Sequence, residues 1–219
     1  MNATASQPLA LVVDYGMGNA QSVLNALESL GVSAVLSSAP ADFARATHII
    51  LPGVGAFGDC MKELHSRGLL PLLEQAVRKD RKPYLGICLG MQILADSGEE
   101  GKVTKGLGWI AGTVGRLSDS GKALRIPHVG WNDALVRASN LLFKNITQPI
   151  FYFVHSFALR TARAEDIAAK TEYGELFTSA VAKENIFGVQ FHPEKSQRAG
   201  LELLSNFMNL SSPWSPLTI

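Results

Sequence analysis

Apolar and polar positions in the first half of the chain follow two alternating patterns. Short apolar runs predict buried strands at residues 9–13, 32–36, 47–51 and 84–87. Between them, apolar residues three or four positions apart predict helices, the clearest at 23–30, which Gly31 ends, and others at 61–64 and 72–77. Strands that alternate with helices favour an α/β fold with a mostly parallel central sheet flanked by helices.

The pattern changes after residue 106. Glycine-rich apolar stretches predict strands at 107–117, 124–131, 150–157, 167–173, 176–183 and 186–191, with a hairpin turn between the last two. A closing helix is predicted at 199–210 and a loose tail at 211–219. We therefore expect one domain over residues 1–219, with an ordered core at about 8–210 and a β-rich C-terminal half.

Composition and charge exclude several classes of protein. The chain is 47% hydrophobic and 18% charged with a formal net charge of +1, which gives no reason to expect nucleic acid or an anionic membrane as partner. The first seven residues lack the features of a signal peptide, and no apolar run approaches the ~20 residues of a membrane span. We expect a cytoplasmic protein with no membrane association.

The cysteines and glycines predict neither a metal nor an organic cofactor. The two cysteines, Cys60 and Cys88, are expected to remain free thiols in the cytoplasm. The chain contains no Cys-x-x-Cys pair and no Gly-x-x-x-x-Gly-Lys phosphate loop, and Gly16-x-Gly18 lacks the third glycine of a dinucleotide fingerprint.

Cys88 stands where the strand at 84–87 is predicted to meet a helix that begins near Met91. Gly86 and Gly90, two residues to either side, allow strand and helix to pass close to a nucleophile on a sharp turn. The helix start would favour the thiolate, and the N–H of Leu89 is placed to bind an oxyanion. The alternative is that Cys88 is a small buried hydrophobic residue.

A cysteine nucleophile needs a base, and the base needs an orienting group. His192 is the best candidate, because Glu194 follows it by two residues and would share its side of an extended segment. A solvated strand end with a chance ion pair remains the alternative. His155 ranks second, because no carboxylate lies near it in the sequence.

Two further positions can serve the same site. The loop Gly53-Val54-Gly55 follows a neighbouring strand, and its glycines allow a peptide N–H to turn toward the site as a second oxyanion donor. An ordinary tight turn would have the same composition. Gln92, one helical turn after Cys88, can bind a polar substrate group or face solvent.

Together these residues resemble the class I (triad) glutamine amidotransferases, whose fold is flavodoxin-like, over nearly the whole chain. The elbow Gly-Ile-Cys88-Leu-Gly-Met-Gln92, the Pro-Gly-Val-Gly strand and Phe-His192-Pro-Glu194 carry the resemblance. Three other stretches, at 14–19, 127–132 and 152–156, resemble the glutaminase subunit of imidazole glycerol phosphate synthase.

The resemblance implies a glutaminase of histidine biosynthesis without metal or cofactor. Cys88 would attack the side-chain amide of glutamine, His192 would transfer the proton and release ammonia, and Glu194 would orient His192. The remaining roles it implies are oxyanion binding by Leu89, Val54 and Gly55, and substrate binding by Gly53, Gln92, His155 and Ser156.

Ammonia would pass to a (β/α)8-barrel cyclase subunit in a heterodimer. The resemblance places the docking face at Asn19, Pro127, His128, Trp131, Asn132 and Lys195. Trp131 is the residue we expect to anchor the interface, and a core tryptophan is the alternative.

Two other functions stay open. One is a paralogous glutaminase that supplies ammonia to a sugar-modifying amidotransferase. The other is a non-catalytic regulatory subunit with the same fold, which the intact set of Cys88, His192 and Glu194 argues against.

Overall fold

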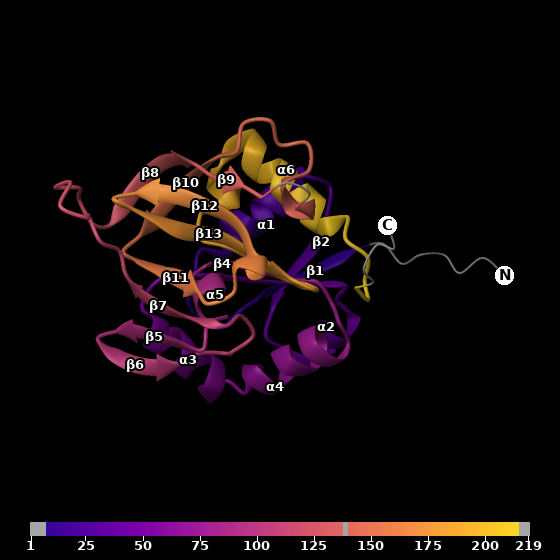
Figure 1. Cartoon of the computed structure of the whole chain (residues 1–219). Coiled ribbons are helices and arrows are strands. Elements are labelled where there is room, and N and C mark those ends of the chain that lie inside the picture. The colour runs from indigo at the N-terminus through magenta and orange to yellow at the C-terminus, as the bar shows by residue number, and fades with distance from the viewer. Residues whose placement is uncertain (1–7, 138–139, 215–219) are drawn as a thin grey trace.

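An eight-stranded sheet forms the centre of the protein in the computed structural model, which describes residues 8–137 and 140–214 (Figure 1). Its strand order is β2-β1-β3-β4-β14-β13-β12-β9. The first five strands in that order pair in parallel and the others antiparallel, which confirms a mostly parallel sheet. The strands are β1 (Leu9–Val13), β2 (Ser33–Ser37), β3 (His48–Gly53), β4 (Tyr84–Cys88), β9 (Leu135–Val136), β12 (Ile167–Tyr173), β13 (Glu175–Lys183) and β14 (Ile186–Val189).

Helices cover both faces of this sheet, and Figure 1 shows α1 and α6 above it and α2, α3 and α4 below. The helices are α1 (Ala20–Ser29), α2 (Pro40–Arg45), α3 (Phe57–Ser66), α4 (Leu69–Leu73), α5 (Leu89–Gln92) and α6 (Gln197–Met208). A π-helix, η1 (Glu74–Lys79), continues α4, and three 3-10 turns are η2 (Leu141–Phe143), η3 (Ala164–Asp166) and η4 (Pro193–Lys195).

The core has two apolar layers, one on each face of the sheet. Ala10 and Val12 of β1 pack in the layer of α1 and α6, whereas Leu11 and Val13 pack in the layer of α3 and α4. Successive side chains of a strand point to opposite faces, so a strand buried on both faces reads as the continuous apolar run seen in the sequence.

Two smaller sheets make the C-terminal half β-rich, as predicted. β8 (His128–Asp133) pairs antiparallel with β10 (Ile150–His155), and a four-stranded sheet has the order β11-β7-β5-β6. Its strands are β5 (Ser97–Glu100), β6 (Lys102–Lys105), β7 (Gly112–Arg116) and β11 (Phe157–Thr161). The hairpin of β5 and β6 and the separate strand β11 were not predicted. The predicted strands at 107–117 and 124–131 were too long at their N-terminal ends.

The described end of the chain is packed against the body of the protein. The backbone N–H of Trp214 donates to the carbonyl of Arg81 at 2.8 Å, and its ring lies 5.7 Å from that of Phe187. The predicted loose tail is therefore wrong up to Trp214, while its last five residues and the first seven of the chain lie outside the described residues.

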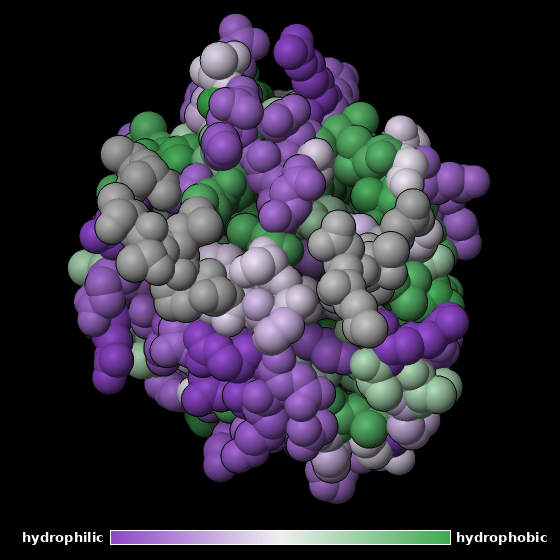
Figure 2. Space-filling view, turned by 90° about the vertical axis from the view of Figure 1, so that its right-hand side faces the viewer, coloured by the Kyte–Doolittle hydropathy of each residue, from purple (hydrophilic) through white to green (hydrophobic). Residues whose placement is uncertain are grey.

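The face on the side of β1, β2 and α2 is mainly hydrophilic, with small separate hydrophobic groups (Figure 2). In the part of the chain that the structure describes, no helix is long and apolar enough to cross a membrane.

Candidate active site

Cys88 ends β4 in a strained backbone conformation, with φ 54° and ψ −107°. The glycines beside it permit the sharp turn. A Cβ on Gly86 would overlap the carbonyl of Gly90, and a Cβ on Gly90 would overlap the carbonyl oxygen of Leu51 in β3. The predicted elbow is thus present, and only residues without a Cβ allow its two arms to approach.

The helix after Cys88 differs from the prediction, because α5 has four residues, all of them buried. Ile93 and Leu94, expected on the apolar side of an amphipathic helix, are 0% exposed. The segment is buried on every side because it lies inside the protein, so it has no solvent face. The N–H of Leu89, the first residue of the turn, still has no acceptor within the turn.

His192 and Glu194 form a buried pair. Nδ1 of His192 lies 2.8 Å from Oε1 of Glu194, and their side chains are 3% and 2% exposed. The backbone is not extended as predicted, because Glu194 lies in the 3-10 turn η4. The His192 N–H donates to the carbonyl of Tyr152 at 2.9 Å, and the hydroxyl of Ser196 donates to the His192 carbonyl at 2.6 Å.

Cys88 and His192 lie at the carboxyl ends of two neighbouring strands, because β4 and β14 are parallel with Ile87 opposite Val189. Burial lowers the pKa of His192, but Cys88 and Glu194 beside it raise that pKa to about 9. Nε2 of His192 is buried and has no hydrogen-bond partner among the described residues. The raised pKa favours the protonated ring at neutral pH, and Glu194 binds it at Nδ1.

The loop after β3 lies directly beside the cysteine, since Gly53 is opposite Cys88 in the parallel register. A Cβ on Gly53 would lie 2.6 Å from the hydroxyl of Tyr15 and 2.8 Å from Cβ of Leu89, so this strand end fits only without a side chain. Gly55 has φ +102°, and Val54 between the two glycines is 42% exposed. The loop therefore begins beside Cys88, and its role as a second oxyanion donor stays a prediction.

Gln92 does not face solvent but lies inside the site, 5% exposed. Its amide nitrogen donates to the carbonyl of Phe157 at 2.8 Å and to Oε1 of Gln190 at 3.0 Å. Gln190 in turn donates to Sγ of Cys88 at 3.6 Å. Gln190 was not predicted as a site residue, although a glutamine inside the apolar run 186–191 is a signal that could have indicated it.

His155 is part of a buried histidine pair. Its Nδ1 lies 2.9 Å from the carbonyl of Phe157, and its Nε2 lies 3.2 Å from Nδ1 of His128. Burial lowers the pKa of His155 to about 3 and that of His128 to about 4. Neither ring has a carboxylate partner among the described residues, whereas His192 has Glu194. Ser156 is partly buried between β10 and β11, and its carbonyl accepts from the N–H of Leu117 at 2.9 Å.

An exposed apolar surface, the β8–β10 face, lies next to the site. Pairing places Val129 opposite Val154 and Trp131 opposite Tyr152, so these side chains share one side of the two-stranded sheet. Val129 is 56% and Trp131 48% exposed, hence Trp131 is no core residue.

The other residues assigned to the docking face differ in their exposure. Nζ of Lys195 lies 5.9 Å from the centre of the Tyr152 ring, and Pro127 is exposed just before β8. Asn19, before α1, and Asn132 are partly buried. His128 is 2% exposed, so this surface does not include it.

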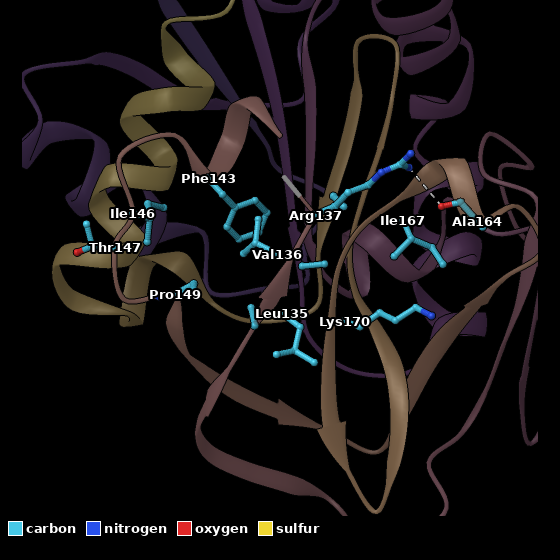
Figure 3. A pocket seen from close by; sticks show the side chains of 13 residues that line it. Leu135, Val136, Arg137, Phe143, Ile146, Thr147, Pro149, Ala164, Ile167 and Lys170 are labelled. Carbon is cyan, nitrogen blue, oxygen red and sulfur yellow. Dashed lines mark hydrogen bonds between the residues drawn. The ribbon is translucent and has the colours of Figure 1, made fainter. Parts of the chain in front are cut away.

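A separate hollow of about 710 Å³ lies between β9, β12, η2 and η3 (Figure 3). Its walls are mostly apolar, and Nη1 of Arg137 at its border donates to the carbonyl of Glu165 at 3.0 Å. It contains none of the residues of the Cys88 site. Residues 8–137 and 140–214 contain no group of three histidines, cysteines or carboxylates that could hold a metal ion.

Comparison with known proteins relates the chain to one family. Residues 11–210 match the family model described as Glutamine amidotransferase class-I. The chain is 45% identical to the imidazole glycerol phosphate synthase subunit HisH 2 of Nitrobacter winogradskyi, over 94% of this chain and 98% of that protein. It is 44% identical to the HisH subunit of Zymomonas mobilis, over 99% and 100% of the two chains.

Solved structures support the fold. A glutamine amidotransferase structure matches with a TM-score of 0.71 and 18% identity, covering 90% of this chain and 96% of that one. PurLQS from Thermotoga maritima matches with a TM-score of 0.70 and 21% identity, covering 93% and 98%.

Proposed function

The chain belongs to the class I glutamine amidotransferase family, and from this premise we propose that it is the glutaminase subunit of an imidazole glycerol phosphate synthase. The single observation that carries the proposal is the buried set of Cys88, His192 and Glu194 at one edge of the sheet. The names of the two relatives favour this partner over a sugar-modifying amidotransferase, and the intact triad disfavours a regulatory subunit.

The reaction begins with attack of the Cys88 sulfur on the side-chain amide carbon of glutamine. The tetrahedral oxyanion is held by the N–H of Leu89 and by a peptide N–H of the Val54 and Gly55 loop. His192, protonated at neutral pH, gives its Nε2 proton to the leaving nitrogen, and the C–N bond breaks to release ammonia. Glu194 fixes the ring and stabilises its charge at 2.8 Å.

Hydrolysis of the thioester completes the cycle. Neutral His192 takes a proton from water as the water oxygen attacks the glutamyl carbonyl. The C–S bond then breaks, glutamate leaves, and Cys88 and His192 return to their starting state.

The carbonyl oxygen of Gln92 has no partner among the described residues, so it can accept a hydrogen bond from the substrate ammonium.

The cyclase partner docks on the β8–β10 face. Trp131 supplies the apolar centre of the interface, and Lys195 lies at its polar margin. This face adjoins η4, which carries Glu194, through the hydrogen bond from His192 to Tyr152 of β10. Ammonia released at Cys88 therefore has a short route to a partner seated here, and the complex works in the cytoplasm.

The test is release of ammonia from glutamine, measured for the wild type and Cys88→Ala, with and without the cyclase subunit carrying its nucleotide. We expect the partner to stimulate the wild type and the variant to release no ammonia in any mixture. Glutamine hydrolysis that the cyclase and its nucleotide leave unchanged would contradict the assigned partner. Ammonia release by Cys88→Ala would contradict the assigned nucleophile.

A further inference from the structure

The sulfur of Cys88 is the end of a chain of hydrogen bonds. Nε2 of Gln190 lies 3.6 Å from Sγ, and Oε1 of Gln190 lies 3.0 Å from Nε2 of Gln92. Nε2 of Gln92 also lies 2.8 Å from the carbonyl oxygen of Phe157. A carbonyl oxygen only accepts, so this contact fixes the orientation of both amides. Gln190 therefore presents an N–H, not an oxygen, to the sulfur.

A second branch reaches the same carbonyl of Phe157. Nδ1 of His155 lies 2.9 Å from that oxygen, so Nδ1 carries a hydrogen. A neutral ring has one donor and one acceptor, hence Nε2 of His155 accepts. Its partner at 3.2 Å, Nδ1 of His128, must be the donor. The two rings then form a chain of neutral Nδ1–H tautomers.

The hydrogen bonds of Asn132, at the far end of this branch, lead independently to the same tautomers. Nδ2 of Asn132 donates to the carbonyl of Glu172 at 2.9 Å, and Oδ1 accepts from the N–H of Asp133 at 2.8 Å. The group that faces Nε2 of His128 at 3.3 Å is therefore the amide N–H₂. His128 accepts at Nε2 and must donate at Nδ1, as deduced from the other end.

Each contact along the network joins one donor to one acceptor once both rings are neutral. A proton added to either ring would place two N–H donors against each other, for example Nε2 of His155 against Nδ1 of His128. The low pKa values of the two buried rings, about 4 and about 3, agree with this arrangement. The network is thus a rigid support for the Gln190 amide rather than a set of interchangeable contacts.

We propose that Gln190 is a positioning residue for the reaction, whose amide N–H holds the Cys88 sulfur as a thiolate facing His192. The proposal rests on the proposed function of Cys88 as nucleophile. A sulfur that accepts from Gln190 has its charge stabilised, since hydrogen bonds to an ionised acceptor are about twice as strong as neutral ones. Gln190 is 0% exposed, so water cannot replace the donor if it is removed.

The test is Gln190→Met, which keeps the length of the side chain and removes the donor. Alkylation of Cys88 by iodoacetamide is followed against pH in the full chain, and peptide mass mapping separates it from alkylation of Cys60, which is 0% exposed. We expect the midpoint of the alkylation profile to rise by about one pH unit, which slows alkylation about tenfold below the midpoint. Gln75→Met, the same change at an exposed glutamine, should keep the wild-type profile.

Ammonia release provides the second readout. We expect kcat of Gln190→Met to fall about tenfold or more with a smaller change in KM, because the interaction acts on the nucleophile. An unchanged alkylation profile, with or without a loss of kcat, would overturn the proposal. The profile does not require glutamine hydrolysis, so it remains decisive even if the wild type releases no ammonia and the proposed function fails.

A measurement on the wild type covers the case in which the variant does not fold. Nitrogen NMR of the imidazoles should show both His128 and His155 as neutral Nδ1–H tautomers at pH 7. An Nε2–H tautomer at either ring would break the chain of donors and overturn the proposed support of Gln190.

Discussion

Cys88 and Glu194 together raise the pKa of His192, and Glu194→Gln isolates the part that is due to the carboxylate. Glutamine keeps an oxygen within reach of Nδ1, so the size of the side chain and the hydrogen bond at 2.8 Å can persist while the charge is lost. Both side chains are nearly fully buried, at 3% and 2% exposed, so solvent screens the lost charge weakly. We expect the pKa of His192 to fall by roughly 1–3 units.

The effect on stability has a defined sign. The folded-state pKa of about 9 lies above the ordinary 6.5, so the folded protein holds this proton more tightly than the unfolded chain does. The resulting stability is fully present below pH 6.5 and is lost as the pH rises through 9. Its full size is about 3 kcal/mol, from ~1.4 kcal/mol for each unit of pKa shift. Glu194→Gln should remove about half of it or more.

The assay is urea unfolding of the wild type and the variant at about pH 6.5 and about pH 9.5. From the lower to the higher pH, the free energy of unfolding should decrease more for the wild type than for Glu194→Gln, by about 1–3 kcal/mol. Glu184→Gln is the control, because this glutamate is 55% exposed in an ion pair with Arg81. Equal pH dependence of the wild type and Glu194→Gln would refute the assigned role of the carboxylate.

Three other changes test different parts of the structure. Gly90→Ala places a Cβ on the carbonyl oxygen of Leu51, so its melting temperature should fall by at least ~10 °C, whereas Gly58→Ala in α3 should be tolerated. Trp131→Ala should weaken cyclase binding about tenfold or more, measured by calorimetry, with an unchanged melting temperature; unchanged binding would remove Trp131 from the interface. Because the pKa values of His128 and His155 are lowered in the folded state, their contribution to stability is fully present above pH 6.5. The free energy of unfolding, measured in urea, should therefore decline as the pH falls from 6.5 toward 4. A flat profile would contradict the burial of the two rings in their neutral form.

The strands and helices of the first half could be predicted because each has a recognisable pattern of apolar residues in the sequence. β1, β3 and β4 are buried on both faces and therefore read as apolar runs. The elbow was also predictable, since Gly86 and Gly90 carry the steric requirement in the sequence itself. The pairing of His192 with Glu194 was predicted correctly, but from an extended backbone that the 3-10 turn η4 replaces.

The elements that escaped prediction depend on tertiary contacts. β5 and β6 are short and rich in exposed polar side chains, so they lack the alternation that marks a half-buried strand. α5 has only one turn and lies entirely in the core, which no local pattern reveals. The chain of hydrogen bonds that runs from Asn132 through His128 to His155 requires the register of β8 against β10. Gln190 acquires its role only when β14 lies beside β4.

The most direct test of the account is to trap the glutamyl thioester. Wild-type protein mixed with glutamine in the presence of the cyclase and its nucleotide is quenched with acid, digested and analysed by mass spectrometry. The account predicts a glutamyl adduct on the peptide that contains Cys88, formed at the rate of ammonia release and absent from Cys88→Ala. Ammonia release without any adduct on that peptide, or at an undiminished rate in Cys88→Ala, would contradict it.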